Sequence, residues 1–360
     1  MDTHHTYGVH DALTDVRGLR VGHAQRTDDG WLTGTTVVLA PEGGAVASVD
    51  SRGGAPGTRE TDALDPRNVV ERIHAVVLTG GSAFGLDSAA GVMAWLEEQG
   101  RGVSVGPDPS QVVPVVPAAV IFDLGRGGNW RARPDAALGR EAAEAAAGTE
   151  LEAPVPQGCV GAGAGAVVGG LKGGIGTASV RLASGALVAA LVAVNAAGSV
   201  TDPVTGVLYG ELGELTDGSP YLPSEDEHTE ARMLLAEARE ETAKRAAGTL
   251  RPALNTTLAV VATDAEISRP QAQRLAGSGH DGLARAIRPI HLMHDGDTVF
   301  ALSTADRALG EGEFNDLLAA GADAVTRAVV KAVRAAEGVD GPGGVFPAYR
   351  DLYDGPRPRD

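Results

Sequence analysis

The chain has 360 residues, enough for a large buried core, and a formal net charge of −17. That charge repels phosphate backbones, so the sequence predicts no nucleic-acid partner. Hydrophobic residues make up 43% of the chain but aromatic residues only 4%, and there are 50 glycines, so we expect a core of Ala, Val and Leu with closely approaching backbones.

Runs rich in Val and Ile alternate along the chain with Ala-rich stretches, a pattern that predicts a mixed α/β layered protein. The predicted strands are residues 35–39, 45–50, 75–79, 115–123, 186–195, 258–263 and 298–303. The predicted helices are residues 84–99, 135–147, 225–247, 269–287 and 313–337. Pro114 and Pro117 place the start of the fourth strand at a sheet edge or entrance, because proline cannot donate to a ladder.

Two features in the middle of the chain indicate in which cellular compartment we expect the protein. Cys159 is the single cysteine, so it cannot form an intrachain disulfide, and we expect a reducing cytoplasm. No histidine lies near it in sequence, so we interpret it as a small core residue rather than a nucleophile. Residues 182–201 carry no charge, but Ala, Gly, Ser and Asn195 dilute their hydrophobicity, so we predict a buried strand with its turns and no membrane partner.

The helix predicted from residue 225 starts with the capping-box pattern of Ser224 and Glu227 and leads into an exposed connector, 249–255. The connector ends in Asn255-Thr256-Thr257, where the strand-like run 257–262 begins. Taken alone, Asn-Thr before a strand is ordinary turn chemistry. If the chain cuts itself before Thr256, however, that residue gains a hydroxyl nucleophile and a free α-amine that can act as its base.

Several motifs occur in the order found in one known family. They are Val21-Gly22-His23 after residues 13–16, Thr35-Thr36-Val37-Val38, residues 50–58 with Arg52-Gly53-Gly54, residues 78–86, Asn255-Thr256-Thr257, and His294-Asp295-Gly296-Asp297-Thr298. In this order the chain, from about residue 11 to 304, resembles the DmpA-like L-aminopeptidase/D-esterases, whose relatives include β-aminopeptidases and nylon-oligomer hydrolases. The resemblance implies a four-layer αββα sandwich of the N-terminal-nucleophile type, in one domain, 1–360, self-cleaved into fragments 1–255 and 256–360.

The resemblance also implies roles for individual residues. Thr256 is the nucleophile, released by a cut after Asn255, and its α-amine, with a reference pKa of about 8, replaces a histidine base. Asp295 and Asp297 orient the Thr256 amine and hydroxyl, although an Asp-Gly turn between two elements would give the same pattern. Asn195 would donate to an oxyanion, and Lys172 would stabilise charge; a strand-ending Asn and a solvated turn lysine are the alternatives.

Other residues are expected to form the substrate pocket. Gly80, Gly81 and Ser82 lie between a predicted strand and helix and fit neither a nucleophile elbow nor a dinucleotide fingerprint. We interpret them as a pocket-lining turn with amides available to substrate. Several relatives have tyrosine where this chain has Phe122, so Phe122 would form a pocket wall without a hydroxyl.

The resemblance implies no cofactor and no metal, although His291, His294, Asp295 and Asp297 are chemically able to bind one. The predicted function is a self-processing amidohydrolase that removes N-terminal residues from small peptides, amides or esters. The family suggests a homo-oligomer, tetrameric or larger. Two alternatives remain: an acyltransferase of the ornithine acetyltransferase type, and a metabolite-binding protein that uses the turn at residues 80–85 for phosphate.

Overall fold

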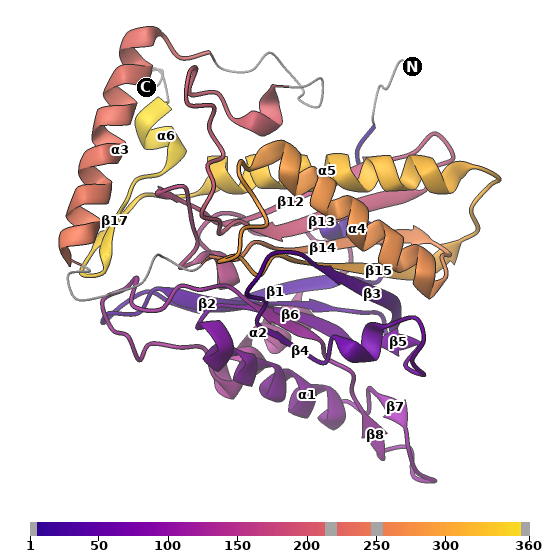
Figure 1. Ribbon diagram of the computed structural model, residues 1–360. Helices are drawn as coiled ribbons and strands as arrows, with labels where there is room; N and C mark the ends of the chain where they lie inside the picture. The colour runs from indigo at the N-terminus through magenta and orange to yellow at the C-terminus, as the bar shows by residue number, and fades with distance from the viewer. Residues whose placement is uncertain (1–5, 213–221, 246–254, 354–360) are drawn as a thin grey trace.

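Two β-sheets packed face to face form the centre of the molecule, and a helical layer covers the outer face of each (Figure 1). The computed structural model describes residues 6–212, 222–245 and 255–353. The predicted connector 249–255 lies outside the described residues except for Asn255.

One sheet has five strands and is built from the first third of the chain. Its order is β1 (Arg20–Arg26), β2 (Thr33–Leu39), β6 (Ala75–Thr79), β9 (Ala118–Val120) and β4 (Thr58–Arg59). The helices α1 (Ser88–Glu98) and α2 (Ala136–Gly148) cover its outer face, where α2 packs on β1 and β2. Gly22 of β1 permits that contact, since a Cβ there would lie 2.2 Å from the Ala146 backbone nitrogen.

The second sheet has six strands and mixes residues from both sides of the predicted cut. Its order is β12 (Ile175–Arg181), β13 (Leu187–Ala193), β14 (Leu258–Ala265), β15 (Thr298–Arg307), β3 (Ala45–Ser51) and β5 (Arg72–Ile73). The pair β14 and β15 is parallel, and every other neighbouring pair in this sheet is antiparallel. Helices α4 (Arg269–Ala286) and α5 (Glu313–Ala335) cover its outer face.

The remaining elements lie at the margins. Helices α3 (Glu225–Arg245) and α6 (Tyr349–Tyr353) stand at one side with the hairpin of β16 (Val339–Gly341) and β17 (Gly344–Phe346). Two more short hairpins are formed by β7 (Val103–Ser104) with β8 (Val112–Val113), and by β10 (Val167–Val168) with β11 (Leu171–Lys172). The predicted capping box is present, since Ser224 exchanges hydrogen bonds with Glu227, and a second one joins Ser268 and Gln271 at the start of α4.

The core between the sheets is made mainly of Ala, Val and Leu, as the composition predicted. Fully buried side chains from both sheets meet there, among them Leu78, Leu191, Val260 and Phe300. Burial of such a side chain stabilises the fold by roughly 1.5–3 kcal/mol. The predicted four-layer α/β architecture is therefore confirmed.

One predicted strand is wrong in extent. Of residues 115–123 only Ala118–Val120 pair as a strand, next to the two-residue edge strand β4. Pro114 and Pro117 remove two donors from the first part, and the last residues turn away into a loop. The uncharged stretch 182–201 is β13 with its turns, as predicted, and among the described helices none is long and apolar enough to cross a bilayer.

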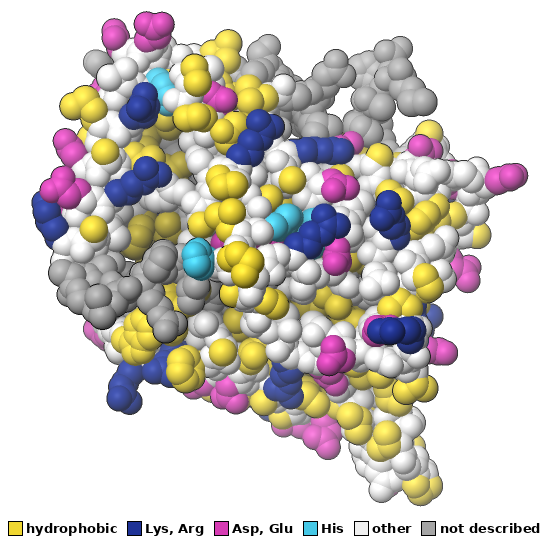
Figure 2. Space-filling model, viewed as in Figure 1, with side chains coloured by type: hydrophobic (Ala, Val, Ile, Leu, Met, Phe, Trp, Pro, Cys, Tyr) yellow, Lys and Arg dark blue, Asp and Glu magenta, His cyan; other side chains and the backbone are white. Residues whose placement is uncertain are grey.

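On the face shown in Figure 2, Lys and Arg side chains stand singly among acidic and apolar ones. The described residues of that face form no continuous basic stripe.

Candidate active site

Thr256 lies immediately before β14 and is buried, with 5% of its surface exposed. Its backbone N–H donates to the Asn195 carbonyl at 2.8 Å. Its hydroxyl donates to the carbonyl oxygen of Asn255 at 2.6 Å and accepts from the Gly296 N–H at 3.1 Å. The predicted nucleophile is thus held against the carbonyl group of the bond predicted to be cut.

The parallel pairing of β14 with β15 brings the predicted carboxylates to Thr256. Leu258 lies opposite Thr298, so the residues that precede the two strands are also neighbours, and Asn255 forms a bridge with Asp295. Asp297 accepts from the Thr257 N–H at 2.7 Å through Oδ1. Asp295 accepts from the Leu292 N–H at 3.1 Å.

The two carboxylates are buried at the same place, and their environments differ. Burial raises the pKa of Asp295, and the charge of Asp297 adds to that rise. Asp297 Oδ2 instead accepts from the His291 N–H at 3.1 Å and lies 2.7 Å from His291 Nδ1. Asp297 therefore has donors on both oxygens, and Asp295 is the carboxyl whose pKa is raised.

The turn containing Arg52, Gly53 and Gly54 holds the loop of the two aspartates in place. The Arg52 N–H donates to the Asp297 carbonyl at 2.7 Å. Gly53 has φ +95°, and a Cβ there would lie 2.5 Å from the Asp295 carbonyl oxygen, so the close approach requires glycine. The Arg52 side chain meets a carboxylate at the surface, Asp50, at 3.1 Å.

Asn195 is fully buried just after β13, and its amide orientation is fixed. Oδ1 accepts from the Val167 N–H at 3.0 Å and from Arg126 Nη1. Nδ2 has no hydrogen-bond partner among the described residues. Since the Asn195 carbonyl holds the Thr256 N–H, this unused donor belongs to a residue in direct contact with the nucleophile.

Lys172 is fully buried rather than solvated. Its Nζ donates to the carbonyls of Gly163, Ala166 and Gly173 at 2.9, 3.0 and 3.0 Å. Burial lowers the pKa of Lys172 to about 8. These contacts brace the loop whose Val167 N–H binds Asn195, so the solvated-turn alternative is wrong, and a role in stabilising charge on the substrate stays a prediction.

Arg126 was not predicted from the sequence, yet it joins the site residues. It donates through Nη2 to Asn255 Oδ1 at 3.0 Å, and through Nη1 to Asn195 Oδ1 and to the Gly165 carbonyl at 2.6 Å. Burial lowers its pKa to about 10, so the guanidinium remains charged at neutral pH. The only sequence signal is a basic residue between two glycines, Gly125 and Gly127, which many surface turns share.

The turn at Gly80, Gly81 and Ser82 does not offer its amides to a ligand. Gly80 N–H donates to the Gly34 carbonyl at 2.9 Å, Gly81 N–H to Asp123 Oδ1 at 2.6 Å, and Ser82 N–H to the Ile121 carbonyl at 3.0 Å. The expectation that these three amides are available to substrate is therefore wrong, and a phosphate site in the turn at residues 80–85 would also lack them. The turn is instead tied to the loop that carries Asp123 and Arg126.

Phe122 lies in that same loop and is partly exposed. Its ring packs edge to face against Trp130, with 6.4 Å between the ring centroids. Its role as a pocket wall stays a prediction.

The four residues considered as metal ligands have other contacts or point to solvent. His291 lies beside Asp297 and packs against His280 at 4.7 Å between ring centroids, and His294 is exposed. Among residues 6–212, 222–245 and 255–353, no three His, Cys, Asp or Glu side chains are grouped to hold a metal ion.

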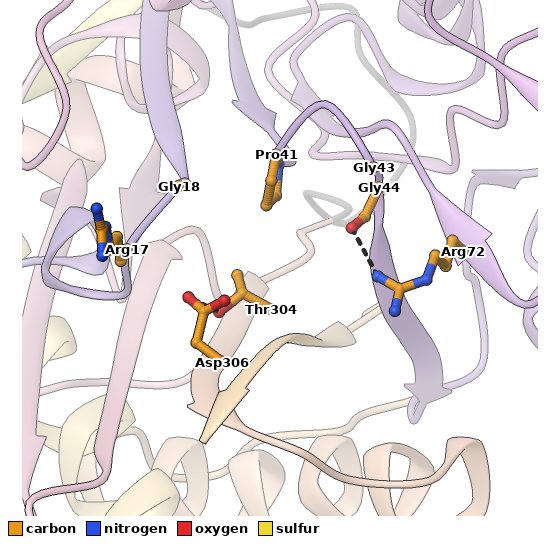
Figure 3. A pocket seen from close by; sticks show the side chains of 8 residues that line it. All are labelled: Arg17, Gly18, Pro41, Gly43, Gly44, Arg72, Thr304 and Asp306. Atoms are coloured by element: carbon orange, nitrogen blue, oxygen red, sulfur yellow. Dashed lines mark hydrogen bonds between the residues drawn. The ribbon is translucent and has the colours of Figure 1, made fainter. Parts of the chain in front are cut away.

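A cavity of about 310 Å³ lies away from this site (Figure 3). Its lining includes Arg17, Arg72, Thr304 and Asp306. Thr304 and Asp306 lie near the end of strand β15, whereas the site lies before its first residue, Thr298. Arg72 donates to the Gly44 carbonyl at 3.0 Å.

Known proteins resemble this chain over nearly its whole length. The sequence model of peptidase family S58 matches residues 11–346. A protein of Mycobacterium tuberculosis named uncharacterized aminopeptidase is 46% identical over 365 residues, which cover 96% of this chain and 98% of the relative. A 6-aminohexanoate-oligomer endohydrolase of Kocuria sp. is 31% identical over 296 residues, which cover 81% of this chain and 74% of the relative.

The solved structure of L-aminopeptidase D-Ala-esterase/amidase from Ochrobactrum anthropi, described as a variant of the Ntn hydrolase fold, aligns with a TM-score of 0.71 at 20% identity. The alignment covers 95% of this chain and 92% of that structure. The fold predicted from the sequence is the fold of this hydrolase.

Proposed function

The chain belongs to peptidase family S58, and from that membership we propose that it cuts its own backbone between Asn255 and Thr256 and then works through Thr256. The chain is a peptide-bond hydrolase. The proposed substrates are small peptides, amides or esters, from which it removes N-terminal residues through an acyl-Thr256 intermediate.

The contacts of Thr256 support a route for the self-cleavage. Oγ1 attacks the Asn255 carbonyl carbon, the bond from that carbon to Thr256 N breaks, and the hydroxyl proton moves to the departing nitrogen. Water then hydrolyses the ester, leaving a carboxylate on Asn255 and restoring the Thr256 hydroxyl. The hydroxyl is already 2.6 Å from the carbonyl oxygen, which is the observation that carries the proposal.

The same contacts support turnover. The new α-amine replaces an N–H that bonds the Asn195 carbonyl, so that carbonyl keeps the amine beside Oγ1. The neutral amine takes the hydroxyl proton as Oγ1 attacks the substrate carbonyl, and later delivers it to the leaving amine. Asn195 Nδ2 is the donor available for the oxyanion. Asp297 holds the Thr257 N–H next to the nucleophile, and Asp295 holds the Leu292 N–H of the loop before β15.

Intact-mass analysis with N-terminal sequencing tests this function. We expect two fragments, the second beginning at Thr256, and hydrolysis of amino-acid p-nitroanilides by the cleaved protein. Thr256→Ala should stay at the full-length mass of 36.5 kDa and be inactive. Thr256→Ser, which keeps a hydroxyl, should still cleave. Hydrolysis by an uncut chain, or a cut elsewhere, would overturn the proposal.

We further propose that the enzyme works in a reducing cytoplasm and as a homo-oligomer of four or more chains. The lone Cys159 supports the first and the family resemblance the second. Light scattering on the purified protein measures the oligomeric state directly.

A further inference from the structure

The side chain of Asn255, whose backbone bond to Thr256 is the proposed cut, is held by a contact of its own. It is buried, with 6% of its surface exposed, and its Oδ1 accepts from Arg126 Nη2 at 3.0 Å. The same guanidinium holds Asn195, the residue in contact with the nucleophile. The uncut chain therefore presents a bound acyl residue whose side-chain oxygen is in contact with a cation.

The position of Asn255 is informative because one hydroxyl serves two reactions. In self-cleavage, Thr256 Oγ1 attacks the Asn255 carbonyl, and in turnover it attacks the carbonyl of the substrate's acyl residue. Both carbonyl carbons must come within bonding reach of the same oxygen. The Asn255 side chain thus marks a place where the side chain of a substrate's acyl residue lies.

Arg126 determines which chemical groups can bind at the position of the Asn255 side chain. Its hydrogen-bond acceptors among the described residues are neutral oxygens of Asn195, Asn255 and Gly165. The nearby carboxylate of Asp123 attracts the guanidinium charge, but its Oδ1 is bound to the Gly81 N–H. When Asn255 leaves, Nη2 loses an acceptor, and an apolar substrate side chain would not replace it.

We propose that Arg126 is a specificity-determining residue that selects acyl residues with a side-chain oxygen at the Asn255 position, namely N-terminal asparaginyl and aspartyl residues. This inference rests on the proposed function of Thr256. Both residues carry an oxygen acceptor on Cγ. A carboxylate there would also pair with the guanidinium charge, so the aspartyl and asparaginyl substrates are separate arms of the test.

The first experiment uses the self-cleaved wild-type enzyme and four p-nitroanilides, those of Asn, Asp, Leu and Ala. Leucine is close to asparagine in size and shape but has no acceptor. We expect kcat/KM for the Asn or Asp substrate to exceed that for Leu by about tenfold or more. Equal rates, or a preference for Leu, would overturn the inference.

The second experiment compares Arg126→Met and Arg126→Lys with a control, Arg131→Met, which removes an exposed arginine from the same segment. Rates are divided by the amount of chain with a free Thr256, measured by mass spectrometry. Arg126→Met should bring the Asn-to-Leu ratio close to one, Arg126→Lys should lower it, and Arg131→Met should leave it unchanged.

The failures are distinguishable. Absence of a cut at Thr256, or of hydrolysis of all four substrates, would refute the proposed function and this inference together. Cleavage and hydrolysis without the acceptor preference would refute the inference alone, as would a preference that persists in Arg126→Met. If Arg126→Met does not cleave itself, the wild-type ratio and Arg126→Lys decide, and an unchanged ratio in Arg126→Lys overturns the assignment.

Discussion

At the scale of single residues, the site is held by backbone groups as much as by side chains. Thr256 Oγ1 accepts from the Gly296 N–H, and the Thr256 N–H donates to a carbonyl. These contacts fix the hydroxyl without a histidine. Asn195 Nδ2 has no hydrogen-bond partner among the described residues. A substitution that removes this donor can therefore test its role in the reaction without breaking a bond that holds the fold.

Asn195→Asp is the sharpest substitution of this kind. Aspartate keeps an oxygen for Arg126 and the Val167 N–H but removes the Nδ2 donor. We expect kcat to fall by about 10²–10³ with little change in KM, as when one oxyanion donor is lost. Steady-state kinetics on equal amounts of cleaved enzyme checks this. A rise in KM alone, with kcat retained, would argue against a donor role.

The raised pKa of Asp295 gives a pH prediction for stability. In the pH window between 3.8 and its raised pKa, the Asp295 carboxyl is protonated in the folded chain and ionised in the unfolded chain. The free energy of unfolding contributed by this carboxyl therefore falls as pH rises through that window. Asp295→Asn, which still offers an oxygen to the Leu292 N–H, should be more stable than its parent at pH 7, and this advantage should shrink toward pH 4.

Denaturant unfolding in a Thr256→Ala background, where the chain stays in one piece, measures that difference. A stability advantage that is larger at pH 4 than at pH 7 would contradict the assignment.

At the scale of elements, the parallel pair β14 and β15 creates the site by starting two strands side by side. The loop before β15 is then held by the turn at Gly53, whose backbone lies against the Asp295 carbonyl. The turn and the loop are more than 200 residues apart in sequence, so only the completed sheet brings them together.

Gly53→Ala should disturb this contact. At φ +95°, and with a Cβ 2.5 Å from the Asp295 oxygen, alanine is strained by about 1–3 kcal/mol. We expect slower self-cleavage and a lower melting temperature. Gly43→Ala is the matched control, because nothing lies within 4 Å of its Cβ position. Equal behaviour of the two variants would show that the turn does not position the loop.

Local sequence patterns predicted some of the strands with the correct bounds and did not predict others. The continuous apolar run of β6 was predicted with the bounds observed, since every side chain in it is buried. β1 and β12 were not predicted: β1 has polar and charged residues at His23, Gln25 and Arg26, and β12 contains Gly176, so neither has a strong strand pattern. Each is an edge strand that pairs over its whole length with one neighbour, β2 or β13, and a local reading of the sequence does not include that pairing.

The site was predictable where a motif exists. Thr256, Asp295 and Asp297 were identified from ordered motifs and lie together, whereas Lys172 proved to be enclosed by carbonyls and Arg126 was missed. The contacts of Arg126 depend on the loop between β9 and α2, which reaches Asn195 and Asn255 beside the six-stranded sheet. Such a contact between distant segments leaves no local pattern.

At the scale of the whole molecule, the proposed cut divides the chain but not the sheet. β14 and β15 lie between β13 and β3, which belong to the other fragment. Ion pairs also join the two sides, including Asp11 with Arg327 at 2.7 Å and Glu211 with Arg334 at 2.6 Å. Removal of fragment 256–360 would expose the core of the six-stranded sheet.

We therefore expect the cleaved enzyme to elute in size-exclusion chromatography as one particle containing both fragments in equal amounts. The fragments should separate only in denaturant. Recovery of either fragment alone from a native column would contradict this expectation.

Because β14 and β15 lie in the middle of the sheet, the proposed cut would make refolding of this protein depend on concentration. Before the cut, the sheet closes within a single chain, at a rate that does not depend on concentration. After the cut, unfolded enzyme is two molecules, and the same strands can only be reinserted when the fragments meet, so recovery should slow on dilution. Under the proposed cleavage, the covalent link between the fragments would serve for the first assembly, and the lifetime of the cleaved enzyme would depend on keeping β14 and β15 in the sheet.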